Sequence, residues 1–167
     1  LTTQSEIESP TVPECSIKAA FKSQKLYQVS PLLFMSSYKN AKDASNLRTN
    51  GISHVINLTS HHCPNLHSNQ VTYSSFALSD NVHFDLLSNL DEILKTIKRK
   101  NEENKKVLVH CRMGISRAPS VVIAFLMKYS NMKLDSAFEF LQEINPKVSP
   151  NLGFLMQLKK LEELIFN

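Results

Sequence analysis

Short apolar runs alternate with longer stretches in which apolar residues recur at helical spacing. The short runs, bounded by turn-forming residues, predict strands at residues 25–29, 32–35, 52–58, 71–78 and 107–109. Apolar residues at intervals of three and four predict helices at residues 40–49, 86–100, 118–129, 134–144 and 151–166. Strands that alternate with helices predict an α/β domain whose sheet is largely parallel and covered on both faces.

Residues typical of helix ends support several of these boundaries. Asn50 and Gly51 follow the 40–49 stretch, and glycine is common directly after a helix. Asp85 lies near the start of the predicted helix at residues 86–100, and Asp135 near the start of that at residues 134–144, so we expect each to act as an N-cap. Ligands of such sheets bind beyond the carboxyl ends of the strands, and the loops there are where we expect the chemistry.

The length and composition fit one globular domain. The chain has 167 residues, 42% hydrophobic and 20% charged, and a second core would need more length. Polar residues with Pro10 and Pro13 predict a flexible N-terminal tail over residues 1–16 and the domain over residues 17–167. The apolar run at residues 121–127 is far shorter than the ~20 residues of a membrane span. The polar, acidic first residues do not resemble a secretory signal.

Charge and cysteine content narrow the function classes further. A net charge of +4 without a basic run interleaved with aromatic residues argues against nucleic acid as a partner. Three cysteines are too few for a disulfide framework and suit a reducing compartment, which predicts a cytoplasmic or nuclear location, or both. His61 and His62 beside Cys63 are interpreted as polar loop residues, so we expect no metal and no cofactor. The glycosylation sequon at Asn57 lies inside a strand-like run and is interpreted as chance.

The most informative segment is residues 107–119, which predict a strand, a tight loop and the start of a helix. A sharp turn of this kind points several backbone N–H groups inward and makes a nest for an anion. Gly114 permits the backbone to bend, and Pro119 suits the first helical turn.

Cys111 and Arg117 are the candidate catalytic residues of this loop. A cysteine that faces backbone amides, a helix N-terminus and an arginine is favoured as the thiolate nucleophile. Arg117 can fold back over the loop, where its planar guanidinium matches two phosphate oxygens. A lone cysteine after a buried strand is more often a small core residue. The surrounding pattern of His before Cys and Gly-x-Ser-Arg after it favours the catalytic interpretation.

The sequence HCRMGISR at residues 110–117 resembles the active-site motif of the protein tyrosine phosphatase superfamily. Residues 118–127 and 145–158 resemble its dual-specificity subgroup, as do residues 41–58, and the resemblance runs from about residue 25 to residue 164. It implies a mixed sheet of about five strands with helices on both sides. It also implies a pocket shallow enough to admit phosphoserine and phosphothreonine as well as phosphotyrosine. The implied phosphate-binding residues are Arg112, Met113, Gly114, Ile115, Ser116 and Arg117.

The resemblance also assigns a general acid, which must protonate the leaving oxygen. Residues 77–86 resemble the acid loop of the family and place the acid at Asp80, with Asp85 as the alternative. His110 is expected to hold the loop and to favour the thiolate, and Asn151 to hydrogen-bond the loop. Arg112 is expected to point outward, toward substrate or solvent.

One residue departs from the family pattern. Ser or Thr usually follows the arginine, and its hydroxyl is thought to stabilise the departing thiolate, whereas this chain has Ala118. Loss of one such hydrogen bond amounts to about 1–3 kcal/mol, so we expect a slow second step or compensation by Ser116. Cys63 follows a predicted strand and is a candidate redox partner for Cys111, with an unreactive thiol as the alternative.

The predicted function is therefore hydrolysis of phosphorylated proteins through a phosphocysteine intermediate. Two alternatives stay open: a phosphoinositide or RNA 5′-phosphate as substrate, and a phosphoprotein-binding module with little catalysis. Met113 and Ile115 make the loop apolar where lipid-directed relatives tend to carry lysines, and Ala118 keeps the binding module in consideration. The substrate protein and the oligomeric state do not follow from the sequence.

Overall fold

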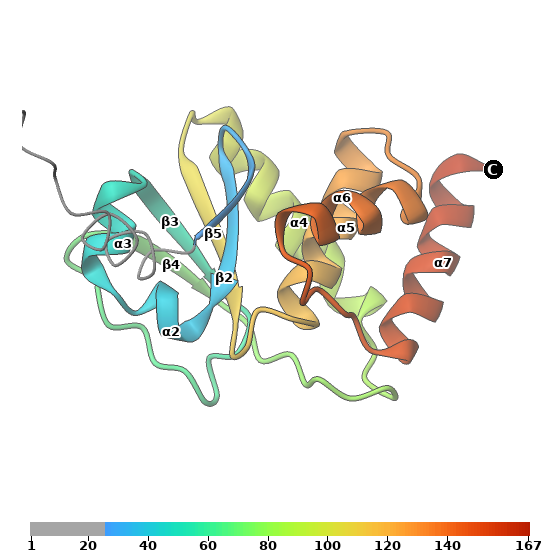
Figure 1. Ribbon diagram of the computed structural model, residues 1–167, viewed down its shortest axis with the longest axis horizontal. Helices are drawn as coiled ribbons and strands as arrows, with labels where there is room; N and C mark the ends of the chain where they lie inside the picture. The colour runs from blue at the N-terminus through green and yellow to red at the C-terminus, as the bar shows by residue number, and fades with distance from the viewer. Residues whose placement is uncertain (1–25) are drawn as a thin grey trace, which may run out of the picture.

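The computed structural model describes residues 26–167, which form a five-stranded sheet flanked by helices (Figure 1). The strand order is β1-β2-β5-β3-β4. The β1–β2 pair is antiparallel, and the other neighbouring pairs are parallel. The strands are β1 (Tyr27–Ser30), β2 (Leu33–Ser37), β3 (Ile52–Asn57), β4 (Thr72–Ser75) and β5 (Lys106–Cys111). The predicted mixed, mostly parallel sheet is confirmed.

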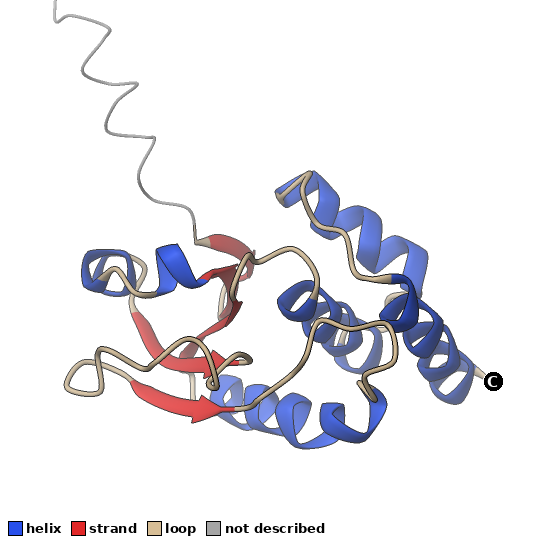
Figure 2. Ribbon diagram, turned by 90° about the horizontal axis from the view of Figure 1, so that it is seen from below, coloured by secondary structure: helices blue, strands red, loops and turns tan. Residues whose placement is uncertain are grey.

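Helices cover both faces of this sheet (Figures 1 and 2). Two short helices, α2 (Tyr38–Ala41) and α3 (Ala44–Thr49), lie on one side. On the other side lie α4 (Leu87–Glu102), α5 (Arg117–Tyr129), α6 (Leu134–Ile144) and α7 (Leu152–Phe166).

The alternation of side chains along the strands explains how both faces are buried. Met35 and Val109 are register partners and belong to the core under α4 and α5. Their chain neighbours Phe34 and Leu108, also partners, belong to the smaller core under α3. Successive residues of a strand point to opposite faces, so an apolar run with no polar alternation builds two cores at once.

Three sequence expectations need correction. The predicted helix at residues 40–49 is two helices, because Asp43 accepts a hydrogen bond from Ser45 N (2.9 Å) and starts α3 anew. The strand predicted at residues 71–78 is limited to Thr72–Ser75. Asp135 does not cap α6. Instead, the first N–H of α6, that of Leu134, donates to Glu162 Oε1 on α7 at 2.8 Å. Local sequence does not reveal a partner so far along the chain.

Of the other expectations, one agrees with the structure and one lies outside the described residues. Gly51 has a positive φ of 68° after α3, in agreement with the predicted helix end. The predicted boundary between a tail at residues 1–16 and the domain lies outside the described residues. Within residues 26–167, no helix is both long and apolar enough to cross a membrane.

Candidate active site

The loop between β5 and α5 lies at the carboxyl edge of the parallel strands. β5 ends at Cys111 and α5 begins at Arg117, so residues 112–116 make the whole connection. Gly114 has a φ of 72°, and a Cβ added there would lie 2.8 Å from Ser37 N and 2.9 Å from Ser36 C. Both the backbone conformation and the close approach of β2 therefore require glycine at this position.

The sulfur of Cys111 lies inside the turn of this loop. The N–H of Gly114 donates to Cys111 Sγ at 3.2 Å, which brings the positive end of a peptide dipole to the sulfur. Cys111 is only 2% exposed, so the nucleophile candidate is sheltered from bulk water. One of the several inward amides predicted for this loop is thus present at the predicted cysteine.

Arg117 folds back toward the acid loop, the segment at residues 76–86 that joins β4 to α4. Its Nη1 donates to the carbonyl of Leu78 at 3.0 Å. The guanidinium is largely buried, and its Nε has no hydrogen-bond partner among residues 26–167. Leu78 could not be identified from the sequence as an arginine partner, because its contribution is a backbone oxygen.

His110 is buried directly before the nucleophile. Burial lowers the pKa of His110 to about 4, so its ring is neutral at neutral pH. The ring stacks on Tyr38 with centroids 5.8 Å apart, and Nδ1 lies 3.4 Å from the carbonyl of Cys111. A neutral imidazole supplies no full positive charge to the sulfur, and the packing role of His110 fits this geometry.

Ser116 and the buried residues of the first turn of α5 close the loop. Ser116 Oγ accepts from Asn151 N at 3.0 Å, and Ser116 O accepts from Ser120 Oγ at 2.7 Å. Ala118 is fully buried and offers no hydroxyl. The Ser116 hydroxyl therefore already accepts one hydrogen bond, from the residue that precedes α7. Compensation for Ala118 by Ser116 stays a prediction.

The two candidate acids differ in their surroundings. Asp80 is exposed, and one of its oxygens accepts from Asn151 Nδ2 at 2.9 Å. Asp85 accepts from Ser88 N at 3.1 Å and from Ser88 Oγ, which caps the start of α4. These hydrogen bonds, that of the Ser88 hydroxyl first, lower the pKa of Asp85 and favour its carboxylate. Asp85 thus has a structural role, while Asp80 is connected to the cysteine loop through Asn151.

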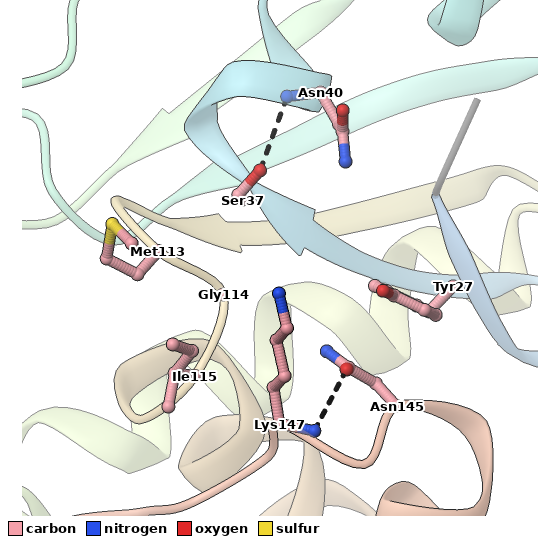
Figure 3. Close-up of a pocket in the computed structure, with 8 residues that line it drawn as sticks. All are labelled: Tyr27, Ser37, Asn40, Met113, Gly114, Ile115, Asn145 and Lys147. Atoms are coloured by element: carbon pink, nitrogen blue, oxygen red, sulfur yellow. Dashed lines mark hydrogen bonds between the residues drawn. The ribbon is translucent and has the colours of Figure 1, made fainter. Parts of the chain in front are cut away.

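The remaining loop residues face outward or line a neighbouring pocket. Arg112 is exposed, as expected, and its carbonyl accepts from Tyr38 N at 3.1 Å. Met113 is 65% exposed. A pocket of about 150 Å³ is lined in part by Met113, Gly114 and Ile115. Figure 3 shows the ammonium of Lys147 reaching toward this part of the loop. Cys111 and Arg117 do not line this pocket, so it is separate from the candidate nucleophile and the candidate phosphate clamp.

Neither Cys63 nor the histidines beside it hydrogen-bond to the cysteine loop in the described part of the chain, but burial, then the neighbouring His62 and the charge of Arg117, lower the pKa of His61. Cys63 is a free, buried thiol, and its carbonyl accepts from Asn57 Nδ2 at 2.6 Å. That amide is fully buried, in agreement with the interpretation of the sequon as chance. In the described part of the chain, no group of three or more His, Cys, Asp or Glu side chains is placed to hold a metal ion. A redox role for Cys63 stays a prediction.

Comparison with known proteins agrees with this geometry. The family model described as dual specificity phosphatase, catalytic domain, matches residues 33–164. Human dual specificity protein phosphatase 1 is 33% identical over 138 residues, which are 83% of this chain and 37% of that protein. Arabidopsis thaliana protein-tyrosine-phosphatase MKP1 is 30% identical over 148 residues, or 89% of this chain and 19% of that protein. The chain thus spans well under half the length of these relatives.

Solved structures show the same fold. A mouse putative dual specificity phosphatase complexed with zinc tungstate has a TM-score of 0.79 and 28% identity, over 96% of this chain and 94% of the other. The human tyrosine phosphatase-like serine/threonine/tyrosine-interacting protein has a TM-score of 0.77 and 27% identity, over 85% and 98% of the two chains. With the family match over most of the described residues, these findings show that the chain belongs to the dual specificity phosphatase family.

Proposed function

We propose that this chain hydrolyses phosphotyrosine, phosphoserine and phosphothreonine on proteins through a phosphocysteine intermediate. One observation carries the proposal: an inward amide at the Cys111 sulfur lies in the same loop as an Arg117 guanidinium whose buried Nε has no partner in the described chain. Buried donors without partners are rare and call for a specific explanation. A phosphoryl oxygen is the acceptor that suits this donor and the planar guanidinium.

In the first step, the Cys111 thiolate attacks phosphorus, the S–P bond forms and the bond to the leaving oxygen breaks. Asp80 gives its proton to that oxygen, so the alcohol or phenol leaves neutral. Arg117 and the backbone amides of residues 112–117 stabilise the negative charge on the equatorial oxygens.

In the second step, the Asp80 carboxylate takes a proton from water as the water oxygen attacks phosphorus. The S–P bond breaks, and inorganic phosphate and the thiolate are released. With Ala118 in place of a hydroxyl, the departing thiolate has one hydrogen bond fewer than in the family pattern, so this step is the slower one.

The proposed substrates are phosphorylated proteins in the cytoplasm, the nucleus or both. The exposed Met113 and the half-buried Ile115 make the outside of the loop apolar, which suits a peptide side chain better than the polyanionic headgroup of a phosphoinositide.

The test is hydrolysis of phosphotyrosine and phosphothreonine peptides and of a phosphoinositide by the purified chain. Cys111→Ser should abolish turnover, and Asp80→Asn should lower it by about 10²–10⁴-fold. Cys63→Ser, a change at the other buried cysteine, is the matched control and should leave turnover unchanged. Turnover of the lipid without turnover of either peptide would contradict the proposal.

A second candidate is a phosphoprotein-binding module with little catalysis. Ala118 favours it, and so does the likeness to a solved protein whose name describes it as phosphatase-like and interacting. Tight phosphopeptide binding by the wild type, with turnover no faster than that of Cys111→Ser, would favour this candidate.

A further inference from the structure

The first two turns of α7 contact the acid loop along much of its length. The loop runs from the end of β4 to the start of α7 before it enters α4 (Figure 1). Asn151, the N-cap of α7, binds Asp80, and Gly153 lies against Val82. Gln157 binds the far end of the loop. These three residues belong to the motif at residues 145–158, to which the sequence assigned no role beyond the hydrogen bond expected of Asn151.

The orientation of the Asn151 amide is fixed by its position as N-cap. Its Oδ1 accepts from Phe154 N at 2.9 Å, as a capping side chain must. The opposite orientation would place an NH₂ group against the Phe154 N–H, with no acceptor between them. The Nδ2 group is therefore the one that faces Asp80, and it donates to one carboxylate oxygen at 2.9 Å.

This donor favours one oxygen of Asp80 as the carrier of the catalytic proton. An amide N–H only donates, and the carbonyl oxygen of a protonated carboxyl is a better acceptor than its hydroxyl oxygen. When Asp80 is protonated, its proton is therefore favoured on the oxygen that Asn151 does not bind. The backbone N–H of Asn151 also donates to Ser116 Oγ at 3.0 Å, one residue before Arg117. A single residue thus connects the acid, the phosphate-binding loop and the start of α7.

Gly153 and Gln157 hold the rest of the loop. A Cβ at position 153 would lie 1.9 Å from Val82 O, so glycine is required for the loop to lie against α7. Gln157 Oε1 accepts from Leu86 N (2.8 Å) and Leu87 N (3.2 Å), two of the unpaired first N–H groups of α4. Its Nε2 donates to Phe84 O at 2.8 Å.

We propose that Asn151 is a positioning residue for general-acid catalysis, which holds one oxygen of Asp80 as an acceptor so that the other presents the proton to the leaving group. This inference rests on the proposed function. The effect of Asn151 on the rate should be largest for substrates with basic leaving groups. An alkoxide needs protonation more than a phenolate, whose conjugate acid has a pKa of about 10. Asn151 therefore contributes most to the turnover of phosphoserine and phosphothreonine.

The test compares Asn151→Ser with the wild type on a phosphothreonine peptide and on p-nitrophenyl phosphate, whose leaving group is a weak base. Serine is as good an N-cap as asparagine but has no N–H that can reach Asp80, so α7 keeps its cap. Because both substrates form the same phosphocysteine intermediate, whose hydrolysis is the slower step, the readout is kcat/KM, which reports the step in which the leaving group departs. We expect kcat/KM on phosphothreonine to fall about 10-fold, a part of the 10²–10⁴-fold effect of a general acid. On p-nitrophenyl phosphate, kcat/KM should fall less than about 2-fold, because little of that effect applies there.

A double-mutant cycle shows whether the effect passes through the acid. In an Asp80→Asn background, Asn151→Ser should change kcat/KM on phosphothreonine by less than about 2-fold, since there is no proton left to position. Asn151→Asp keeps the cap but puts a second carboxylate beside Asp80, which should move the basic limb of the pH–rate profile to higher pH.

Several results would overturn the inference. An equal loss on both substrates, or an undiminished loss in the Asp80→Asn background, would mean that Asn151 acts on the loop or the fold instead. Either result would leave the proposed phosphatase activity standing. A wild type that turns over neither substrate would contradict the proposed function and the inference together.

Discussion

Acidification should destabilise this protein through His110, whose ring is 2% exposed. Burial lowers its pKa from 6.5 to about 4 in the folded state. Between these values the unfolded chain binds the proton and the folded chain does not, so stability is present above pH 6.5 and is lost as the pH falls toward 4. The linkage relation gives a loss of about 2 kcal/mol between pH 7 and pH 5 from this one group.

The assay is urea unfolding of the wild type and of His110→Gln at pH 7 and pH 5. Glutamine is of similar size and does not titrate, so the variant should lose about 2 kcal/mol less than the wild type over this interval, whatever its starting stability. His83→Gln, the same substitution at an exposed side chain, is the matched control for the change of residue itself. If His110→Gln loses as much stability as the wild type, the argument from burial is wrong.

Three further predictions concern the loop and the core. Gly114→Ala should abolish turnover, because the added Cβ would collide with the backbone of β2. Gly51→Ala is the control: its φ is similar, but the added Cβ would be in ordinary contact, 3.6 Å, with a flexible lysine side chain. This variant should lose about 1 kcal/mol of unfolding free energy and keep its turnover. Phe154→Ala should lower the free energy of unfolding by about 3–5 kcal/mol in urea titrations, and Leu164→Ala, at a side chain 77% exposed, by less than about 0.5 kcal/mol. Ala118→Ser should speed the second step by up to tens-fold and diminish a pre-steady-state burst; an unchanged burst would show that the missing hydroxyl does not limit turnover.

The sheet and the nucleophile loop could be predicted because local patterns specify them. Apolar runs such as Val107–Val109 have no polar alternation, and that pattern is enough to indicate a strand buried on both faces. The cysteine loop combines a strand, a glycine and an arginine at fixed spacing, and the structure brings Cys111, Gly114 and Arg117 into one turn.

The contacts that complete the site could not be predicted because they join distant segments. Arg117 binds a backbone carbonyl 39 residues away, and Leu134 receives its cap from Glu162, 28 residues away. Neither partner leaves a periodic or compositional signal. Gly153 and Gln157 were within a recognised motif, but their role depends on the path of the acid loop, which only the fold reveals.

The bond from Arg117 to the Leu78 carbonyl has a consequence for the end of the proposed catalytic cycle. An arginine side chain carries about 2 kcal/mol of rotamer entropy, and here much of that loss accompanies folding instead of phosphate capture. This preorganisation strengthens the binding of any tetrahedral oxyanion of suitable size, whether or not the oxyanion is attached to a protein. Inorganic phosphate, the product of the proposed hydrolysis, would bind more tightly for the same reason, so we expect competitive inhibition by the product to accompany capture of the substrate.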